Sequence, residues 1–76
     1  MRLVTSAQVR AARGLLNWTV RELADKANVH RNTVTNIETG RCAGDPETLS
    51  AIQRALERAG VEFTNGKRPG VRLNKG

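Results

Sequence analysis

The chain is short, basic and poor in aromatic residues. Its 76 residues suffice for one small domain with a limited core. Only 38% of the residues are hydrophobic, with one Trp and one Phe, so a large buried catalytic cavity is not expected. Thirteen lysines and arginines against seven acidic residues give a net charge of +6, which favours a polyanionic partner. A basic surface that serves only solubility is the alternative.

The features of several other protein classes are missing. No apolar run approaches the roughly 18 to 20 residues that span a bilayer. The stretch MRLVTSAQVRAA lacks the apolar region of a signal peptide, so we expect a cytosolic protein with no membrane partner. A single cysteine, Cys42, excludes an internal disulfide, and with a lone His30 no metal site is expected. No nucleophile–base pair stands out either, which predicts that the chain is not an enzyme and needs no cofactor.

The first two predicted helices each begin with a capping-box pattern. Thr5 is followed three residues later by Gln8, and Thr19 by Glu22, so that each pair can satisfy two free backbone amides. We expect helices over 6–16 and 20–27, the second ending at Asn28 in a left-handed conformation. The residues expected to face the core are Val9, Ala12 and Leu16 in the first helix, and Leu23, Ala24 and Ala27 in the second.

The third and fourth helices are expected over 31–39 and 46–59, and a glycine follows each of them. His30 is a weaker N-cap residue than Ser or Thr, whereas Asp45 followed by Pro46 suits an N-cap and a first helical position. The residues expected to face the core are Val34 and Ile37 in the third helix, and Leu49, Ile52, Leu56 and Ala59 in the fourth.

After residue 60 the hydrophobic period changes to two, and Asn65-Gly66 supplies a hairpin turn signal. Since an isolated hairpin is marginal in water, it should pack on the helices or pair with a second copy. The predicted fold class is therefore mainly α, with a compact four-helix domain over 1–60 and a C-terminal β-hairpin with a basic tail over 61–76. The candidate dimer-interface or core residues of this hairpin are Val61, Phe63, Val71 and Leu73.

The predicted third helix has two different sides. When 31–38 is placed at about 100° per residue, Val34 and Ile37 lie on one side. The opposite side carries Arg31, Asn32, Thr35 and Asn36. Arg and Asn can each bond bidentately to a base edge, and Thr can contact a base or the thymine methyl. Asn and Thr weaken a helix, so something other than helix stability favours them at these positions. This side therefore indicates contact with DNA bases. A solvated polar face is the alternative. The scarcity of aromatic side chains argues against RNA or single strands.

The segment 6–60 resembles the helix-turn-helix domain of the lambda Cro/CI-type repressors, also called the Xre family. The residues that carry the resemblance are Arg13, Trp18-Thr19, Glu22-Leu23-Ala24, Val29, Val34, Ile37-Glu38 and Gly40. In that family the helix matching 31–38 is the recognition helix. The resemblance implies base contacts by Arg31, Asn32 and Asn36, with Thr35 also facing the major groove. It further implies an ion pair between Arg13 and Glu38, for which two independent surface charges are the alternative.

Several positions depart from the family pattern. Val20 stands where a phosphate-binding glutamine is common, so Thr19, its neighbouring amides and Arg21 would have to hold that phosphate. His30 can cap the third helix, meet a phosphate or stay exposed. A hairpin replaces the fifth helix through which several phage repressors dimerise. The phosphate contacts predicted over the whole chain are Thr19, Arg21, His30, Thr33, Thr39 and Arg41, with Lys67 and Arg68 as possible contacts from a tail that can equally be solubilising.

These expectations combine into one functional prediction. The chain should be a sequence-specific transcriptional regulator, a repressor, that binds a pseudo-palindromic double-stranded DNA operator as a homodimer. Two alternatives use the same fold. One is an antitoxin that also binds a toxin protein, and the other is an antiactivator that binds a protein partner in place of DNA.

Overall fold

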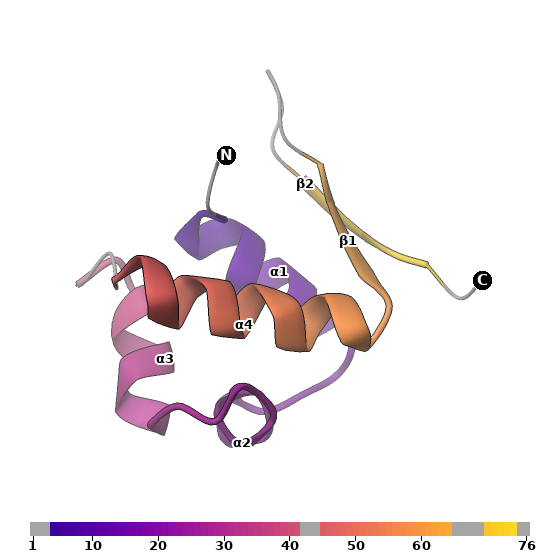
Figure 1. Ribbon diagram of the computed structural model, residues 1–76. Coiled ribbons are helices and arrows are strands. Elements are labelled where there is room, and N and C mark those ends of the chain that lie inside the picture. Colours follow the sequence, from indigo (N-terminus) through magenta and orange to yellow (C-terminus); the bar gives the residue numbers. More distant parts are fainter. Residues whose placement is uncertain (1–3, 42–44, 65–69, 75–76) are drawn as a thin grey trace.

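The computed structural model describes residues 4–41, 45–64 and 70–74 (Figure 1). Its elements are α1 (Ser6–Leu15), α2 (Val20–Ala27), α3 (Arg31–Glu38), α4 (Pro46–Arg58), β1 (Val61–Thr64) and β2 (Gly70–Leu73). The predicted fold class, four helices followed by a β-hairpin, is confirmed. Three helices end one residue earlier than predicted, because Leu16, Thr39 and Ala59 are C-cap residues. No helix in the described part of the chain is long and apolar enough to cross a membrane.

The helices begin where the sequence predicts because side-chain caps satisfy their first amides. Both capping boxes form: the Thr5 and Thr19 hydroxyls accept from the N3 amides, and the N3 side chains accept from the cap amides. At α4 the Asp45 Oδ1 atom accepts from the Thr48 amide at 2.7 Å, and this backbone hydrogen bond lowers the pKa of Asp45. Asn28 ends α2 in the left-handed region, with φ of 58°.

The core lies where α4 crosses the other helices (Figure 1). Its largest fully buried side chains are Val9, Leu23, Val34, Ile37, Ile52 and Leu56, all of them predicted core residues. Leu16 and Ala59, which we also expected to face inward, are only half-buried because they lie at helix ends. The core is small and aliphatic, as the composition predicts.

The hairpin packs on α1 and α4, with β1 and β2 antiparallel. Val61 pairs with Leu73 and Phe63 with Val71. Val61 is 3% exposed and belongs to the core, whereas the other three candidate interface residues are half-buried against it. The predicted turn at Asn65-Gly66 lies outside the described residues.

A buried glutamine fastens the hairpin to α1. The Gln8 side chain is 3% exposed overall, and its Nε2 group donates to the Thr64 carbonyl at 3.2 Å and to the Gly70 carbonyl at 3.1 Å. Its Oε1 atom accepts from the Thr5 amide in the capping box. All of its polar atoms are therefore satisfied, and one side chain joins the start of α1 to both strands.

Candidate nucleic-acid interface

The α3 helix presents two chemically different sides. Val34 and Ile37 are buried, together with Glu38 at 4% exposed. The four side chains predicted to contact bases, Arg31, Asn32, Thr35 and Asn36, are all exposed. The helix thus carries a continuous polar surface that no other described element covers. Hydrogen-bonding side chains on a helix that can enter a major groove are suited to contact base edges.

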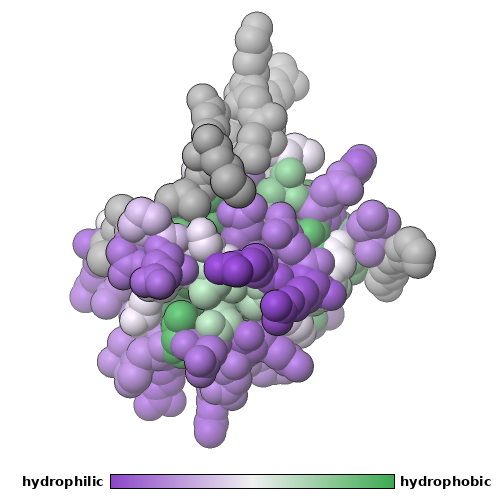
Figure 2. All heavy atoms as spheres, in the orientation of Figure 1, coloured by the Kyte–Doolittle hydropathy of each residue, from purple (hydrophilic) through white to green (hydrophobic). Residues whose placement is uncertain are grey.

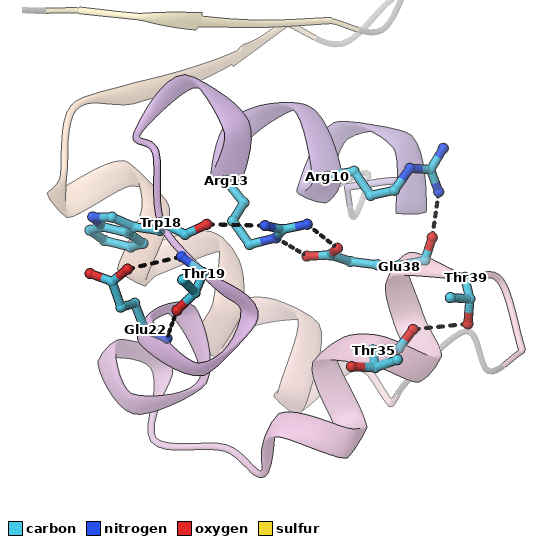
Figure 3. Close-up of polar contacts among 8 residues, drawn as sticks. All are labelled: Arg10, Arg13, Trp18, Thr19, Glu22, Thr35, Glu38 and Thr39. Carbon is cyan, nitrogen blue, oxygen red and sulfur yellow. Dashed lines mark hydrogen bonds and ion pairs between the residues drawn. The ribbon is translucent and has the colours of Figure 1, made fainter.

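Two arginines of α1 hold the C-terminal end of α3 (Figure 3). Arg13 donates through Nε to Glu38 Oε2 at 2.8 Å and through Nη2 to Glu38 Oε1 at 2.9 Å, so the implied ion pair is present. This hydrogen bond raises the pKa of Arg13, which remains a cation. Arg10 donates to the Glu38 carbonyl. Because both arginines lie on α1, that helix fixes the position and rotation of α3.

The Arg13 guanidinium also reaches the turn before α2. Its Nη1 group donates to the Trp18 carbonyl at 3.0 Å (Figure 3). The Lys26 ammonium lies 5.9 Å from the centre of the Trp18 ring. One side chain of α1 therefore contacts both α3 and the residue preceding the N-cap of α2. The relative orientation of α2 and α3 depends on these contacts of Arg13.

The turn between α2 and α3 borders a polar cleft. His30 caps α3 through Nδ1, which accepts from the Asn32 amide at 3.1 Å, so in the neutral ring the proton lies on Nε2. A cleft of about 430 Å³ is lined by Arg21, Ala24, Asp25, Val29, His30 and Arg31. The guanidinium groups of Arg21 and Arg31 and the distal nitrogen of the capping histidine are donors for a phosphate at this cleft, while the Asp25 carboxylate there opposes an anion. The sequence left His30 open as a cap, a phosphate ligand or an exposed histidine. The structure shows an exposed cap, and its geometry allows contact with a phosphate.

The N-terminus of α2 offers fewer donors than the sequence suggested. The Thr19 amide donates to Glu22 Oε1 at 2.9 Å, and the Glu22 amide to Thr19 Oγ1 at 3.0 Å (Figure 3). These two amides are therefore occupied, and the Thr19 hydroxyl hydrogen remains as a donor. The Glu22 carboxylate also places a negative charge at the site where a phosphate would bind. The sequence does not reveal this carboxylate beside the phosphate, because the capping-box pattern identifies Glu22 only as a helix-start residue.

The remaining predicted phosphate ligands differ in their availability. Thr39 donates its hydroxyl to the Thr35 carbonyl at 2.9 Å, inside α3, and has no second hydroxyl hydrogen for a phosphate (Figure 3). Arg41 is exposed beyond α3, and Thr33 is half-buried. The predictions for Lys67 and Arg68 fall on positions outside the described residues, and Cys42 also lies outside them.

Sequence comparison gives a result that agrees with this geometry. A family model described as helix-turn-helix matches residues 9–63, which is more than half of the chain and covers most of α1, all of α2, α3 and α4, and most of β1. No curated protein sequence matches the chain.

Proposed function

Since the chain belongs to the Cro/CI-type helix-turn-helix family, a family of DNA-binding domains that are typically not enzymes, we propose that it is a sequence-specific transcriptional repressor. In this proposal α3 enters the major groove of double-stranded DNA. Arg31, Asn32 and Asn36 contact base edges, with Thr35 beside them. The observation that carries the proposal is the exposed polar side of α3 on a helix whose other side is anchored by Val34, Ile37 and the Arg13–Glu38 pair.

Backbone phosphates on the two sides of the groove would provide most of the affinity. Arg21, His30 and Thr19 lie at the α2 end of the interface, and Arg41 lies past the other end of α3. Thr33 and Thr39 contribute less, because one is half-buried and the other donates within α3. Since α3 itself carries one arginine, the helix supplies sequence discrimination while flanking cations supply salt-dependent binding.

Selection of bound duplexes from a random DNA pool tests the proposal. We expect an enriched pseudo-palindrome whose two half-sites are one helical turn apart, about 34 to 36 Å from centre to centre. Half-sites without symmetry would contradict the homodimer. A pool that shows no enriched sequence would contradict the regulator itself.

The homodimer that we propose would use the groove between α1 and β2. This groove of about 380 Å³ is lined largely by apolar atoms of Ala7, Ala11, Gly70 and Val71. Near the end of the same helix Leu15 is 42% exposed, the one large hydrophobic side chain so exposed in the described part of the chain. An exposed strand edge beside an apolar groove is a surface that a second copy can cover.

Ala11→Arg is expected to convert the dimer to a monomer in sedimentation velocity, because a charged side chain would fill the groove at an exposed position. Binding to a full palindrome should fall, whereas binding to one half-site should change little. Ala11→Ser is the matched control, since it leaves the groove open. If Ala11→Arg still sediments as a dimer, the interface lies elsewhere.

Glu22→Gln is expected to strengthen DNA binding about two- to fivefold at low salt. The Gln side chain can keep the capping box, because its Oε1 atom still accepts from the Thr19 amide, while the negative charge beside the phosphate is removed. Titration of a labelled operator by fluorescence anisotropy at two salt concentrations measures the effect. Unchanged affinity at both concentrations would show that no phosphate approaches the start of α2.

A further inference from the structure

A second basic surface lies away from the residues proposed to contact DNA. A groove of about 200 Å³ between α2 and α4, named here the α2–α4 groove, is lined by Lys26, Ala27, Asn28, Ala51, Arg54, Ala55 and Arg58. Figure 2 shows this face, with pale green hydrophobic surface between α4 and α2 bordered by purple side chains. The groove lies at the C-terminal end of α2 and includes none of the proposed phosphate ligands: Thr19 and Arg21 lie at the N-terminal end of that helix, and His30 follows two residues after Asn28.

The three cations of the groove have no acidic partner among the described residues, whose ion pairs are Arg13–Glu38 and Arg72–Glu62. Arg54 makes one long hydrogen bond, from Nε to the Ser50 carbonyl at 3.4 Å. The Lys26 ammonium lies over the Trp18 ring. None of the lining residues is acidic. The groove therefore combines a floor of alanine methyl groups with positive charges on both walls.

The chemistry of the groove favours a peptide over a nucleic acid. Within the described part of the chain, no hydrogen bond reaches the carbonyls of Lys26 and Ala27 at the end of α2. A peptide backbone has N–H groups that can donate to these carbonyls, whereas a DNA backbone offers only acceptors. The floor offers no aromatic ring for base stacking. In a twofold dimer through this groove, Lys26, Arg54 and Arg58 would face the same three cations of the other copy, which opposes a second copy of this chain as the occupant.

We propose that the α2–α4 groove docks an acidic segment of a partner protein. Carboxylates of that segment pair with Lys26, Arg54 and Arg58, and its small apolar side chains lie on Ala51 and Ala55. Because this groove shares no residue with the proposed DNA contacts, the regulator can hold DNA and the acidic segment at the same time.

The test uses the full chain and two probes: a fluorescein-labelled 16-residue peptide of Glu and Ala, and a labelled 20-base-pair duplex. We expect saturable peptide binding that perturbs amide resonances of 26–28 and 51–58 in ¹⁵N spectra and leaves those of α3 unchanged. The double variant Arg54→Glu/Arg58→Glu should weaken peptide binding about tenfold and DNA binding by less than about twofold. The matched control Arg21→Glu/Arg41→Glu carries the same change in net charge and should do the reverse.

A third variant separates docking from general attraction between opposite charges. Ala51→Lys adds a positive charge but fills the half-buried floor, so it should weaken peptide binding. Stronger binding by this variant, or equal losses in both double variants, would overturn the proposal. It would equally be overturned if Arg54→Glu/Arg58→Glu abolished DNA binding, which would make the groove a nucleic-acid surface, or if it split a dimer, which would make it a self-interface. Absence of saturable peptide binding overturns it whatever the DNA result.

Discussion

Arg13→Ala is expected to lower the free energy of unfolding by about 3 to 5 kcal/mol. The Glu38 side chain is 5% exposed, and Arg13 is the residue that donates to both of its carboxylate oxygens. Removal of the guanidinium strands a buried negative charge and also leaves the Trp18 carbonyl without this donor. A domain of 76 residues has a total stability of roughly 4 to 11 kcal/mol, so the variant should lose a large part of its stability. Urea denaturation followed by circular dichroism measures the loss.

Two further variants test the cause of this effect. Arg13→Lys keeps the charge but loses the two parallel hydrogen bonds, so it should fall between the wild type and the alanine variant. The double variant Arg13→Met/Glu38→Leu removes both charges and should recover much of the stability, because no charge is left stranded. A loss below about 1 kcal/mol in Arg13→Ala would show that the pair is exposed in solution and does not anchor α3.

Local signals were sufficient to predict where the helices begin. Thr5, Thr19 and Asp45 act within their own helical turns, so three or four residues of sequence contain the whole interaction. Three of the four helices end one residue before the predicted position, because no side chain marks a C-cap such as Leu16 or Ala59. The position of the ion pair came from family resemblance, since 25 residues separate its partners.

Interactions between distant segments could not be predicted from the sequence. Gln8 was identified as a capping residue, but its second role depends on carbonyls 56 and 62 residues away. Nothing local distinguishes Arg10 from a solvated arginine, although it donates to the end of α3. In the hairpin, alternation grouped four apolar residues on one face but could not show that Val61 alone enters the core. A polar side chain that can reach a strand carbonyl is visible only once the strands are placed.

Sequence reasoning did identify the exposed side of α3 in full. The positions of Val34 and Ile37 fix the rotation of the helix, and the helical period then places the other side chains. The helical period does not show whether a side chain is free to donate to DNA or which charges lie beside it. Thr39 and Glu22 show the difference, because one donates its hydroxyl within α3 and the other brings a carboxylate to the start of α2.

The triple variant Arg31→Ala/Asn32→Ala/Asn36→Ala is expected to abolish operator preference. Each bidentate contact between a side chain and a base contributes about 1 to 3 kcal/mol of discrimination, so the loss of three brings specific binding down to the non-specific level. The fold should persist, because all three side chains are exposed and alanine is the best helix former. Competition between the selected operator and a scrambled duplex measures the preference, and unfolding by urea confirms that the fold is retained.

Arg41→Ala separates the two parts of the interface. It should weaken binding to the operator and to the scrambled duplex by the same factor, because a phosphate contact carries no sequence information. It should also reduce the slope of log affinity against log salt by about one. The triple variant should keep more of its salt dependence, since the flanking cations are unchanged. If the triple variant retains the operator preference, α3 does not select the DNA sequence, and the polar side of this helix is then only a solvated surface.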